Sequence, residues 1–145
     1  MPRIKIDLPE KFFEIEINIP VRITDINYGD HVGNDSLVAI IHEARIQFLK
    51  HHGHSTELNI HGAGLIMSDL IIEFKNESFY KDIINVKIAA GEISKVSFEI
   101  FYKLTTLKNN EEILIANAKT TMVCYNYELK KVIAIPEKLK AILVD

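Results

Sequence analysis

Residues 34–53 read NDSLVAIIHEARIQFLKHHG and carry the one long helical pattern in the sequence. Apolar side chains recur along it three or four positions apart, at Leu37, Ile40, Ile41, Ala44 and Phe48. That spacing is the period of one face of an α-helix, so the sequence predicts an amphipathic helix whose apolar stripe is turned towards a core. The three residues before the stripe, Asn34, Asp35 and Ser36, are all favoured at a helix N-cap. Gly53 suits the position just after the helix end.

On either side of this helix the chain alternates apolar and polar residues, which is the period of half-buried β-strands. The alternating stretches are residues 13–19, which Pro20 interrupts, residues 21–24, and four later segments at about 69–74, 84–90, 95–104 and 112–125. Turn-like breaks separate the later segments, and Pro136 predicts a short helix as far as Leu143. The order predicts an α+β architecture, in which a curved antiparallel sheet wraps around one long helix and buries its stripe.

Composition narrows the class of protein. The 145 residues are 48% hydrophobic and 26% charged, which predicts one globular domain spanning residues 1–145. A net charge of −3 argues against a nucleic-acid partner. The sequence has no apolar run long enough to span a membrane and no signal-peptide pattern at its N-terminus. The single cysteine, Cys124, rules out an internal disulfide and fits a reducing compartment, so a cytoplasmic location is expected.

The densest cluster of reactive side chains lies just before the long helix and in its first turn. Asp25, Asp30, His31 and Asp35 fall within eleven residues, with Tyr28 among them and Gly29 and Gly33 allowing tight turns. A helix N-terminus presents backbone N–H groups and a partial positive charge, which suit an anion or a developing oxyanion. The alternative is that residues 34–36 only cap the helix and that the rest is a solvated loop.

Two segments here carry a family resemblance. Residues 21–34, VRITDINYGDHVGN, and residues 42–45, HEAR, resemble the hot-dog-fold acyl-CoA thioesterases of the 4-hydroxybenzoyl-CoA thioesterase type. The pattern of that family runs roughly V-R-x-x-D-x-D-x-x-G-H-V-N-N, with E-A-R on the next helix. Residues 125–137 also resemble the closing strand, turn and helix of that family. The resemblance implies a hot-dog fold from about Phe12 to Leu143, with coenzyme A as part of the substrate and no other cofactor.

The sequence departs from the family at the usual catalytic aspartate, which aligns with Asn27. An amide cannot act as a nucleophile or a general base in place of a carboxylate. The form found here resembles an N-Y-G-x-H-x-G-N-D branch, in which Asn27 would orient the thioester or a water. Asp30, Asp35 and Glu43 are then the candidate carboxylates for activating that water. The alternative for Glu43 is structural pairing with Arg45 or Arg22.

The resemblance also implies substrate contacts. The thioester carbonyl would point at a backbone N–H near Gly33 or Asn34, with Tyr28 and Asp35 beside the substrate. His31 would polarise the substrate or hold the loop.

Several other features have simpler explanations. Ser94 and Lys95 lie on a hairpin where they could contact coenzyme A phosphates, although the hairpin can equally be an ordinary polar turn. His51, His52, His54 and His61 lack further ligands at a familiar spacing, so no metal site is expected. Residues 62–64 are predicted to be a loop entering a strand, and Cys124 is predicted to lie in the core.

These observations predict an acyl-CoA thioesterase that releases free acid and CoA through carboxylate-assisted attack by water. The resemblance implies a homodimer or homotetramer with active sites between subunits. One alternative is a non-catalytic acyl- or acyl-CoA-binding protein that lost its aspartate at position 27. A hot-dog hydratase is a further alternative, which the spacing of Asp25 and His31 fits poorly. The acyl group and the choice between dimer and tetramer stay open.

Overall fold

One curved antiparallel sheet with a long helix against it forms the body of the molecule. The computed structural model describes residues 3–54 and 56–144. The elements are β1 (Asn18–Pro20), the 3₁₀ turn η1 (Ile23–Asp25), α1 (Asn34–His51), β2 (Gly64–Phe74), β3 (Ile83–Ile93), β4 (Ser97–Lys108), β5 (Glu111–Asn126), β6 (Lys131–Val132) and α2 (Glu137–Leu143). The predicted order of one long helix, four long strands and a short helix is confirmed.

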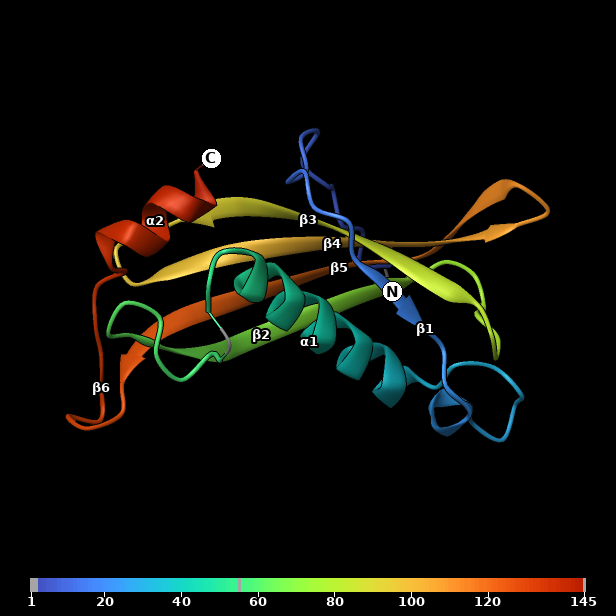
Figure 1. Ribbon diagram of the computed structural model, residues 1–145, viewed down its shortest axis with the longest axis horizontal. Helices are drawn as coiled ribbons and strands as arrows, with labels where there is room; N and C mark the ends of the chain where they lie inside the picture. The colour runs from blue at the N-terminus through green and yellow to red at the C-terminus, as the bar shows by residue number, and fades with distance from the viewer. Residues whose placement is uncertain (1–2, 55, 145) are drawn as a thin grey trace.

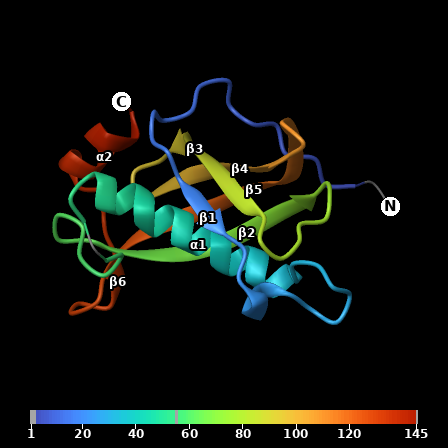
Figure 2. The same ribbon diagram turned by 45° about the vertical axis from the view of Figure 1, so that its right-hand side comes forward.

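The strands run in the order β1-β3-β4-β5-β2, and β6 pairs with β5. All neighbouring pairs are antiparallel. Figures 1 and 2 show α1 lying across one face of the curved sheet, with α2 near the C-terminal end of α1. The predicted α+β architecture, a curved sheet around one helix, is therefore confirmed.

The apolar stripe of α1 is the centre of the core. All five predicted residues are buried and belong to one cluster with side chains from β3, β4 and β5: Leu37, Ile40, Ile41, Ala44 and Phe48. Two of the core-facing residues on β5, Ala116 and Ala118, are small. Small side chains let the sheet approach the helix closely, which is how one helix can fill the hollow of the sheet.

The sequence predicted the C-terminal end of α1 correctly but not its N-cap. The helix begins at Asn34 and its N-cap is Gly33, which offers no side-chain cap. The prediction that Asn34, Asp35 or Ser36 caps the helix is therefore wrong, because these residues form the first turn itself. At the other end Gly53 has φ of 89°, and its N–H donates to the Lys50 carbonyl at 2.9 Å. The predicted glycine stop is confirmed.

The N-terminal segment is less regular than its sequence pattern suggests. Buried and exposed side chains do alternate up to Pro20, but only residues 18–20 form a strand. Residues 21–24 do not resume the strand, and Ile23 is 63% exposed. The Asp25 carboxylate accepts the Arg22 backbone N–H at 2.8 Å and stabilises the η1 turn instead. This local hydrogen bond to a side chain forms in place of the β-sheet hydrogen bonds that the alternating pattern predicted.

The tight connections follow turn chemistry. Asn109 and Asn110, between β4 and β5, have φ of 52° and 63°. Positive φ at both residues is typical of the type I′ hairpin turn, and asparagine tolerates it. Pro136 is the N-cap of α2, so the predicted Pro-initiated helix is confirmed to within one residue. Among the described residues no helix is long and apolar enough to cross a membrane.

Candidate functional site

A tight turn carries the segment between η1 and α1. The Asn27 N–H donates to the His31 carbonyl at 2.9 Å, and the Asp30 N–H donates to the Asn27 carbonyl at 3.1 Å. Asp30 adopts φ of 63°, a left-handed conformation that aspartate tolerates. Ile26 and Val32 form an isolated bridge that closes the turn at its base. These bonds fix the backbone immediately before the helix.

The side chain of Asn27 is oriented by the same turn. Its Oδ1 accepts the Gly29 N–H at 2.9 Å, so the other end of the amide, the Nδ2 group, is the end left to donate. Nδ2 lies beside Gly33, 3.8 Å from the point where a Cβ on that residue would sit. Asn27 therefore places a hydrogen-bond donor, not a base, next to the start of α1.

Gly33 is packed tightly between the turn and the helix. A Cβ there would lie 2.7 Å from Asp35 Oδ1 and 3.4 Å from the Asn27 Cβ. Its N–H donates to the Asp25 carbonyl at 3.0 Å and so is already used. Of the two amides predicted to hold a thioester carbonyl, Asn34 in the first turn of α1 is the better placed, because first-turn amides have no partner within a helix.

His31 is held in one orientation by the backbone. Its Nδ1 lies 3.1 Å from the Val32 carbonyl oxygen, which can only accept. Nδ1 therefore carries the proton in the neutral ring, and Nε2 keeps its lone pair. Nε2 packs beneath Gly29, where a Cβ would come within 3.1 Å of it.

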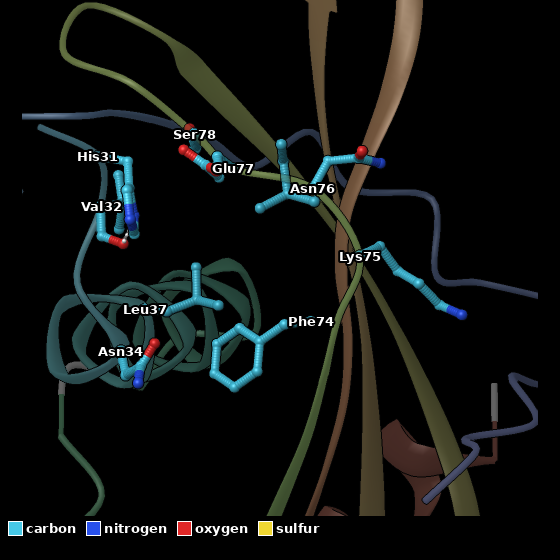
Figure 3. A pocket seen from close by; sticks show the side chains of 10 residues that line it. His31, Val32, Asn34, Leu37, Phe74, Lys75, Asn76, Glu77 and Ser78 are labelled. Carbon is cyan, nitrogen blue, oxygen red and sulfur yellow. Dashed lines mark hydrogen bonds between the residues drawn. The ribbon is translucent and has the colours of Figure 1, made fainter. Parts of the chain in front are cut away.

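A cavity of about 230 Å³ opens beside this helix N-terminus. Figure 3 shows Leu37 and Phe74 side by side at its base, with His31 and Val32 on one side and Ser78 and Glu77 above. Its wall is formed by His31, Val32, Asn34, Leu37, Phe74, Lys75, Asn76, Glu77, Ser78 and Ile115. The cavity thus has an apolar base and a polar rim, the usual make-up of a small-molecule site.

The far wall of the cavity is the connection from β2 to β3, residues 75–82. The Ser78 carbonyl accepts the Val32 N–H at 2.8 Å, which ties this connection to the turn before α1. The Ser78 hydroxyl donates to Asp82 Oδ2 at 3.0 Å, and Lys108 pairs with the other carboxylate oxygen of Asp82. Burial alone would raise the pKa of the Asp82 carboxyl, but hydrogen bonds from Lys108, the Phe79 N–H and Ser78 lower it overall. The connection is therefore a fixed wall.

The comparison with protein families identifies the chain. The model of the thioesterase-like superfamily matches residues 21–143, which includes the turn, α1 and all four long strands. The chain belongs to the thioesterase-like superfamily. This membership places it among thioester hydrolases. A search of curated proteins found no match.

Solved structures agree with the fold of this superfamily. A hypothetical protein from Aquifex aeolicus is 22% identical, with a TM-score of 0.78 over 89% of this chain and 98% of that one. A 1,4-dihydroxy-2-naphthoyl-CoA thioesterase from Synechocystis is 19% identical, with a TM-score of 0.78 over 90% and 95% of the two chains. An aspartate-to-asparagine mutant of a 4-hydroxybenzoyl CoA thioesterase, complexed with 4-hydroxybenzoyl CoA, is 15% identical, with a TM-score of 0.79 over 89% and 97%. These likenesses confirm the predicted hot-dog fold.

The structure brings some of the predicted site residues together. His31 and Asn34 line the cavity. Asn27, Gly33 and Asp35 surround the same helix start. These five residues therefore lie together around the start of α1.

Two members of the same motif lie outside the cavity. Tyr28 is fully exposed at the outer end of the turn, and Asp30 is exposed beside it. Neither side chain lines the cavity within this chain.

Glu43 occupies a different groove. It is nine residues into α1, about 13 Å along the axis from the helix start, where it lines a groove of about 380 Å³ with Asn18 and Arg22. Its carboxylate accepts from Gln47 Nε2 at 2.7 Å. The pairing of Glu43 with Arg45 or Arg22, which the sequence left open, is not what the structure shows, because those arginines pair with Glu57 and Asp25.

Ser94 and Lys95 lie at the opposite end of the sheet from the cavity. They connect β3 to β4 near α2, and the Lys95 carbonyl accepts the Ile135 N–H at 2.9 Å. β3 alone, with eleven residues, spans about 35 Å between the two ends. Ser94 Oγ accepts the Ser97 N–H at 3.0 Å, as in an ordinary serine turn. Within one chain these residues and the cavity are not brought together.

Two further predictions concern reactive side chains. Cys124 is fully buried, as predicted, and burial raises the pKa of its thiol to about 11, so it is not a nucleophile at neutral pH. The histidines pair as rings, with centroids 4.7 Å apart for His54 and His61. Among the described residues no three His, Cys, Asp or Glu side chains converge as metal ligands.

Sequence reasoning missed the wall contributed by residues 74–78. Phe74, Asn76, Glu77 and Ser78 all line the cavity, but in the sequence they form an unremarkable strand end and loop. They lie more than forty residues from the turn that they face. Only the strand order, which puts β2 at the edge next to the start of α1, brings them there. No local signal in the sequence could have indicated it.

Proposed function

We propose that this member of the thioesterase-like superfamily hydrolyses an acyl-CoA thioester, with the acyl group in the cavity beside the start of α1. The observation that carries this proposal is the cavity itself, whose apolar base opens directly onto the first turn of a helix. An acyl group in the base would put its thioester carbonyl at the rim, near Asn34 and His31. The free acid and CoA would be the products, and water the only co-reactant.

The volume of the cavity favours a small acyl group. A cavity of about 150 Å³ is enough for a benzene ring in another protein. The 230 Å³ here would hold a substituted aromatic ring or a short acyl chain. Leu37, Phe74 and Ile115 supply the apolar contacts for such a group.

The electrostatics of the rim favour an oxyanion. The first-turn amides of α1 and the Nδ2 group of Asn27 are donors that the backbone fixes before any charge develops. Donors aimed in advance at a developing negative charge are among the strongest contributions to acyl-transfer catalysis. In this proposal Asn27 is therefore an oxyanion donor.

The active form in this proposal is a homodimer or a homotetramer with sites between subunits. β2 is an edge strand, and no described strand pairs with its outer side. It carries partly exposed apolar residues, namely Ile66, Met67 and Phe74. An uncovered, partly apolar edge strand is a template for pairing with another chain. Two-fold antiparallel pairing of β2 would set the start of one copy's strand beside the cavity of the other.

The distance of Ser94 and Lys95 from the cavity limits how they could contact coenzyme A. If Ser94 and Lys95 contact its phosphates, they must do so across a subunit boundary, because they are remote from the cavity of their own chain. Under this proposal Lys95→Ala raises KM for a CoA thioester several-fold and leaves kcat unchanged.

The direct test measures both binding and turnover. Purified protein is titrated calorimetrically with benzoyl-CoA, and release of free thiol is followed in the same buffer. Saturable thiol release with equimolar benzoate supports hydrolysis.

Binding without any thiol release, on benzoyl-, butyryl- and palmitoyl-CoA alike, would instead support a non-catalytic acyl-CoA-binding protein. The amide at Asn27 favours that second function, since the aspartate-to-asparagine mutant thioesterase above is complexed with 4-hydroxybenzoyl CoA. Formation of a hydroxyacyl-CoA from an enoyl-CoA would favour a hydratase.

A further inference from the structure

The proposed hydrolysis requires a base, and the residues of the cavity offer one. Asn27 presents a donor to the site and cannot accept a proton from water. Asp30 is exposed on the outer turn, and Glu43 lies in another groove. Glu77 is the one carboxylate among the described residues that line the cavity.

Glu77 sits between two anchored neighbours. On one side, Asn76 donates its side-chain Nδ2 to the Leu114 carbonyl at 2.7 Å and its N–H to the Ile115 carbonyl at 3.2 Å. On the other side, the Ser78 carbonyl accepts the Val32 N–H at 2.8 Å. Although its side chain is exposed, the backbone of Glu77 is therefore pinned to β5 and to the turn before α1. This fixes where the carboxylate can reach.

The charges around Glu77 leave its carboxylate available. Lys75 is the nearest cation along the chain, and its Nζ pairs with Glu73 at 2.9 Å. Figure 3 shows the Lys75 side chain directed away from the cavity. Lys108, the cation of the neighbouring wall, pairs with the buried Asp82. Among the described residues Glu77 has no ion-pair partner, so it can accept a hydrogen bond from a water at the rim.

The groups facing Glu77 complete the arrangement. Figure 3 places Glu77 beside Ser78 at the top of the cavity, on the side of His31, with Asn34 and the helix start below. A thioester carbonyl held by the first-turn amides would therefore lie between the base of the cavity and Glu77. A water between Glu77 and that carbonyl carbon would have a proton acceptor on one side and its electrophile on the other.

We infer that Glu77 is the general base of this site and takes over the role that Asn27 cannot fill. This inference rests on the proposed hydrolysis. The Glu77 carboxylate takes a proton from water as the water oxygen bonds to the thioester carbon, and the carbonyl electrons move onto oxygen. When the oxyanion collapses, the C–S bond breaks, and the leaving CoA thiolate takes the proton from Glu77. One water is consumed, and the products are one carboxylic acid and one thiol.

The test compares two matched substitutions in the full-length chain. Glu77→Gln keeps the size of the side chain but removes its basicity. Glu92→Gln makes the same change on β3 at the end of the sheet remote from the cavity. Thiol release from the best acyl-CoA substrate is measured against pH for wild type and both variants, with a thermal melt of each.

Glu77→Gln is expected to lower kcat by 10²- to 10⁴-fold, with KM changed less than threefold and Tm unchanged. At each pH the rate of Glu77→Gln stays below that of wild type, and Glu77→Asp restores part of the rate. Glu92→Gln behaves as wild type.

A Glu77→Gln variant that keeps kcat within threefold of wild type would overturn the role of Glu77 and leave the hydrolysis standing. A wild-type protein that releases no thiol from any acyl-CoA would overturn both. A variant whose KM alone rises would make Glu77 a binding residue and would also overturn its role as a base.

Discussion

At the scale of single residues, Asn27 is the most informative position in the chain. The family resemblance places a catalytic aspartate there, and the structure shows what the amide does in its place. Oδ1 closes the turn through Gly29, and Nδ2 points to the start of α1. The amide therefore presents a donor at this position, where a carboxylate would present an acceptor. Under the proposed hydrolysis, the reactive carboxylate comes from elsewhere in the site.

Asn27→Asp tests this exchange of roles. The variant keeps an oxygen for the Gly29 N–H but puts a negatively charged oxygen where the donor stood. We expect kcat to fall about 100-fold, since losing one oxyanion donor typically costs 10²–10³. Thiol-release kinetics with a thermal melt would check it. A rise in kcat would show instead that the site still works through a carboxylate at position 27.

Asp82 makes the wall of the cavity sensitive to acid. Its pKa in the folded chain lies below its ordinary value of 3.8. At a given acidic pH, the folded state therefore binds fewer protons at this carboxyl than the unfolded state does. The stabilisation is therefore present above about pH 4 and is lost as pH falls through the lowered pKa. Asp82→Asn should reduce stability at neutral pH by about 2 kcal/mol and flatten the acid side of the stability curve.

Urea titrations between pH 3 and pH 7 would measure this effect. The flattening is partial, because the pKa values of Asp69 and Glu73 are also lowered, by hydrogen bonds that include Lys119 and Lys75. Asp7→Asn, on the exposed N-terminal segment, serves as the control. Parallel curves for wild type and Asp82→Asn across this pH range would refute the assignment.

At the scale of elements, a buried charge cluster joins α1 to the loop after it and to the sheet. Arg45 is 5% exposed; its Nε donates to Glu57 at 2.7 Å and its guanidinium to the Tyr102 hydroxyl at 3.2 Å. That hydroxyl also lies 2.8 Å from Thr120 Oγ1 on β5. Each of these four side chains thus has at least one partner in the cluster, which fixes the position of α1 against β4 and β5.

Arg45→Met should destabilise the fold by about 3 kcal/mol, because it leaves Glu57 and the Tyr102 hydroxyl without their main donor. For a chain of this length the loss corresponds to a drop in Tm of roughly 6–12 °C. Adding Glu57→Gln should cost less than the sum of the two single changes. Calorimetric melts of the three variants would show it, and strict additivity would mean that the two side chains do not interact.

The long elements were predictable because their signal is local. The stripe from Leu37 to Phe48 has a helical period, and Asn109 with Asn110 marks a hairpin. The ends of elements were harder, since Asp25 turned an expected strand into a 3₁₀ turn through one side-chain bond. The turn before α1 was recognised as a site because its residues are contiguous. Glu77 was not, because only the order of the strands brings it to that turn.

At the scale of the whole molecule, assembly through the β2 edge should be visible in solution. Met67→Glu places a charge on that edge, where Met67 is 42% exposed, and Leu107→Glu makes a similar change on β4, where Leu107 is 70% exposed. We expect a dimer or tetramer for wild type and Leu107→Glu, and smaller species for Met67→Glu. Size-exclusion chromatography with light scattering decides it. A wild-type monomer at 100 µM, on the order of the affinity of weak dimers, would contradict the proposed assembly.

Under the proposed function, hydrolysis takes place in the small cavity between α1 and residues 74–78. The most direct measurement is kcat/KM for thiol release as a function of acyl size, from acetyl- through benzoyl- to palmitoyl-CoA. A cavity of 230 Å³ predicts a maximum at short or aromatic acyl groups and a fall of at least tenfold for palmitoyl. A profile that rises steadily to palmitoyl-CoA, or no thiol release from any of them, would contradict the account.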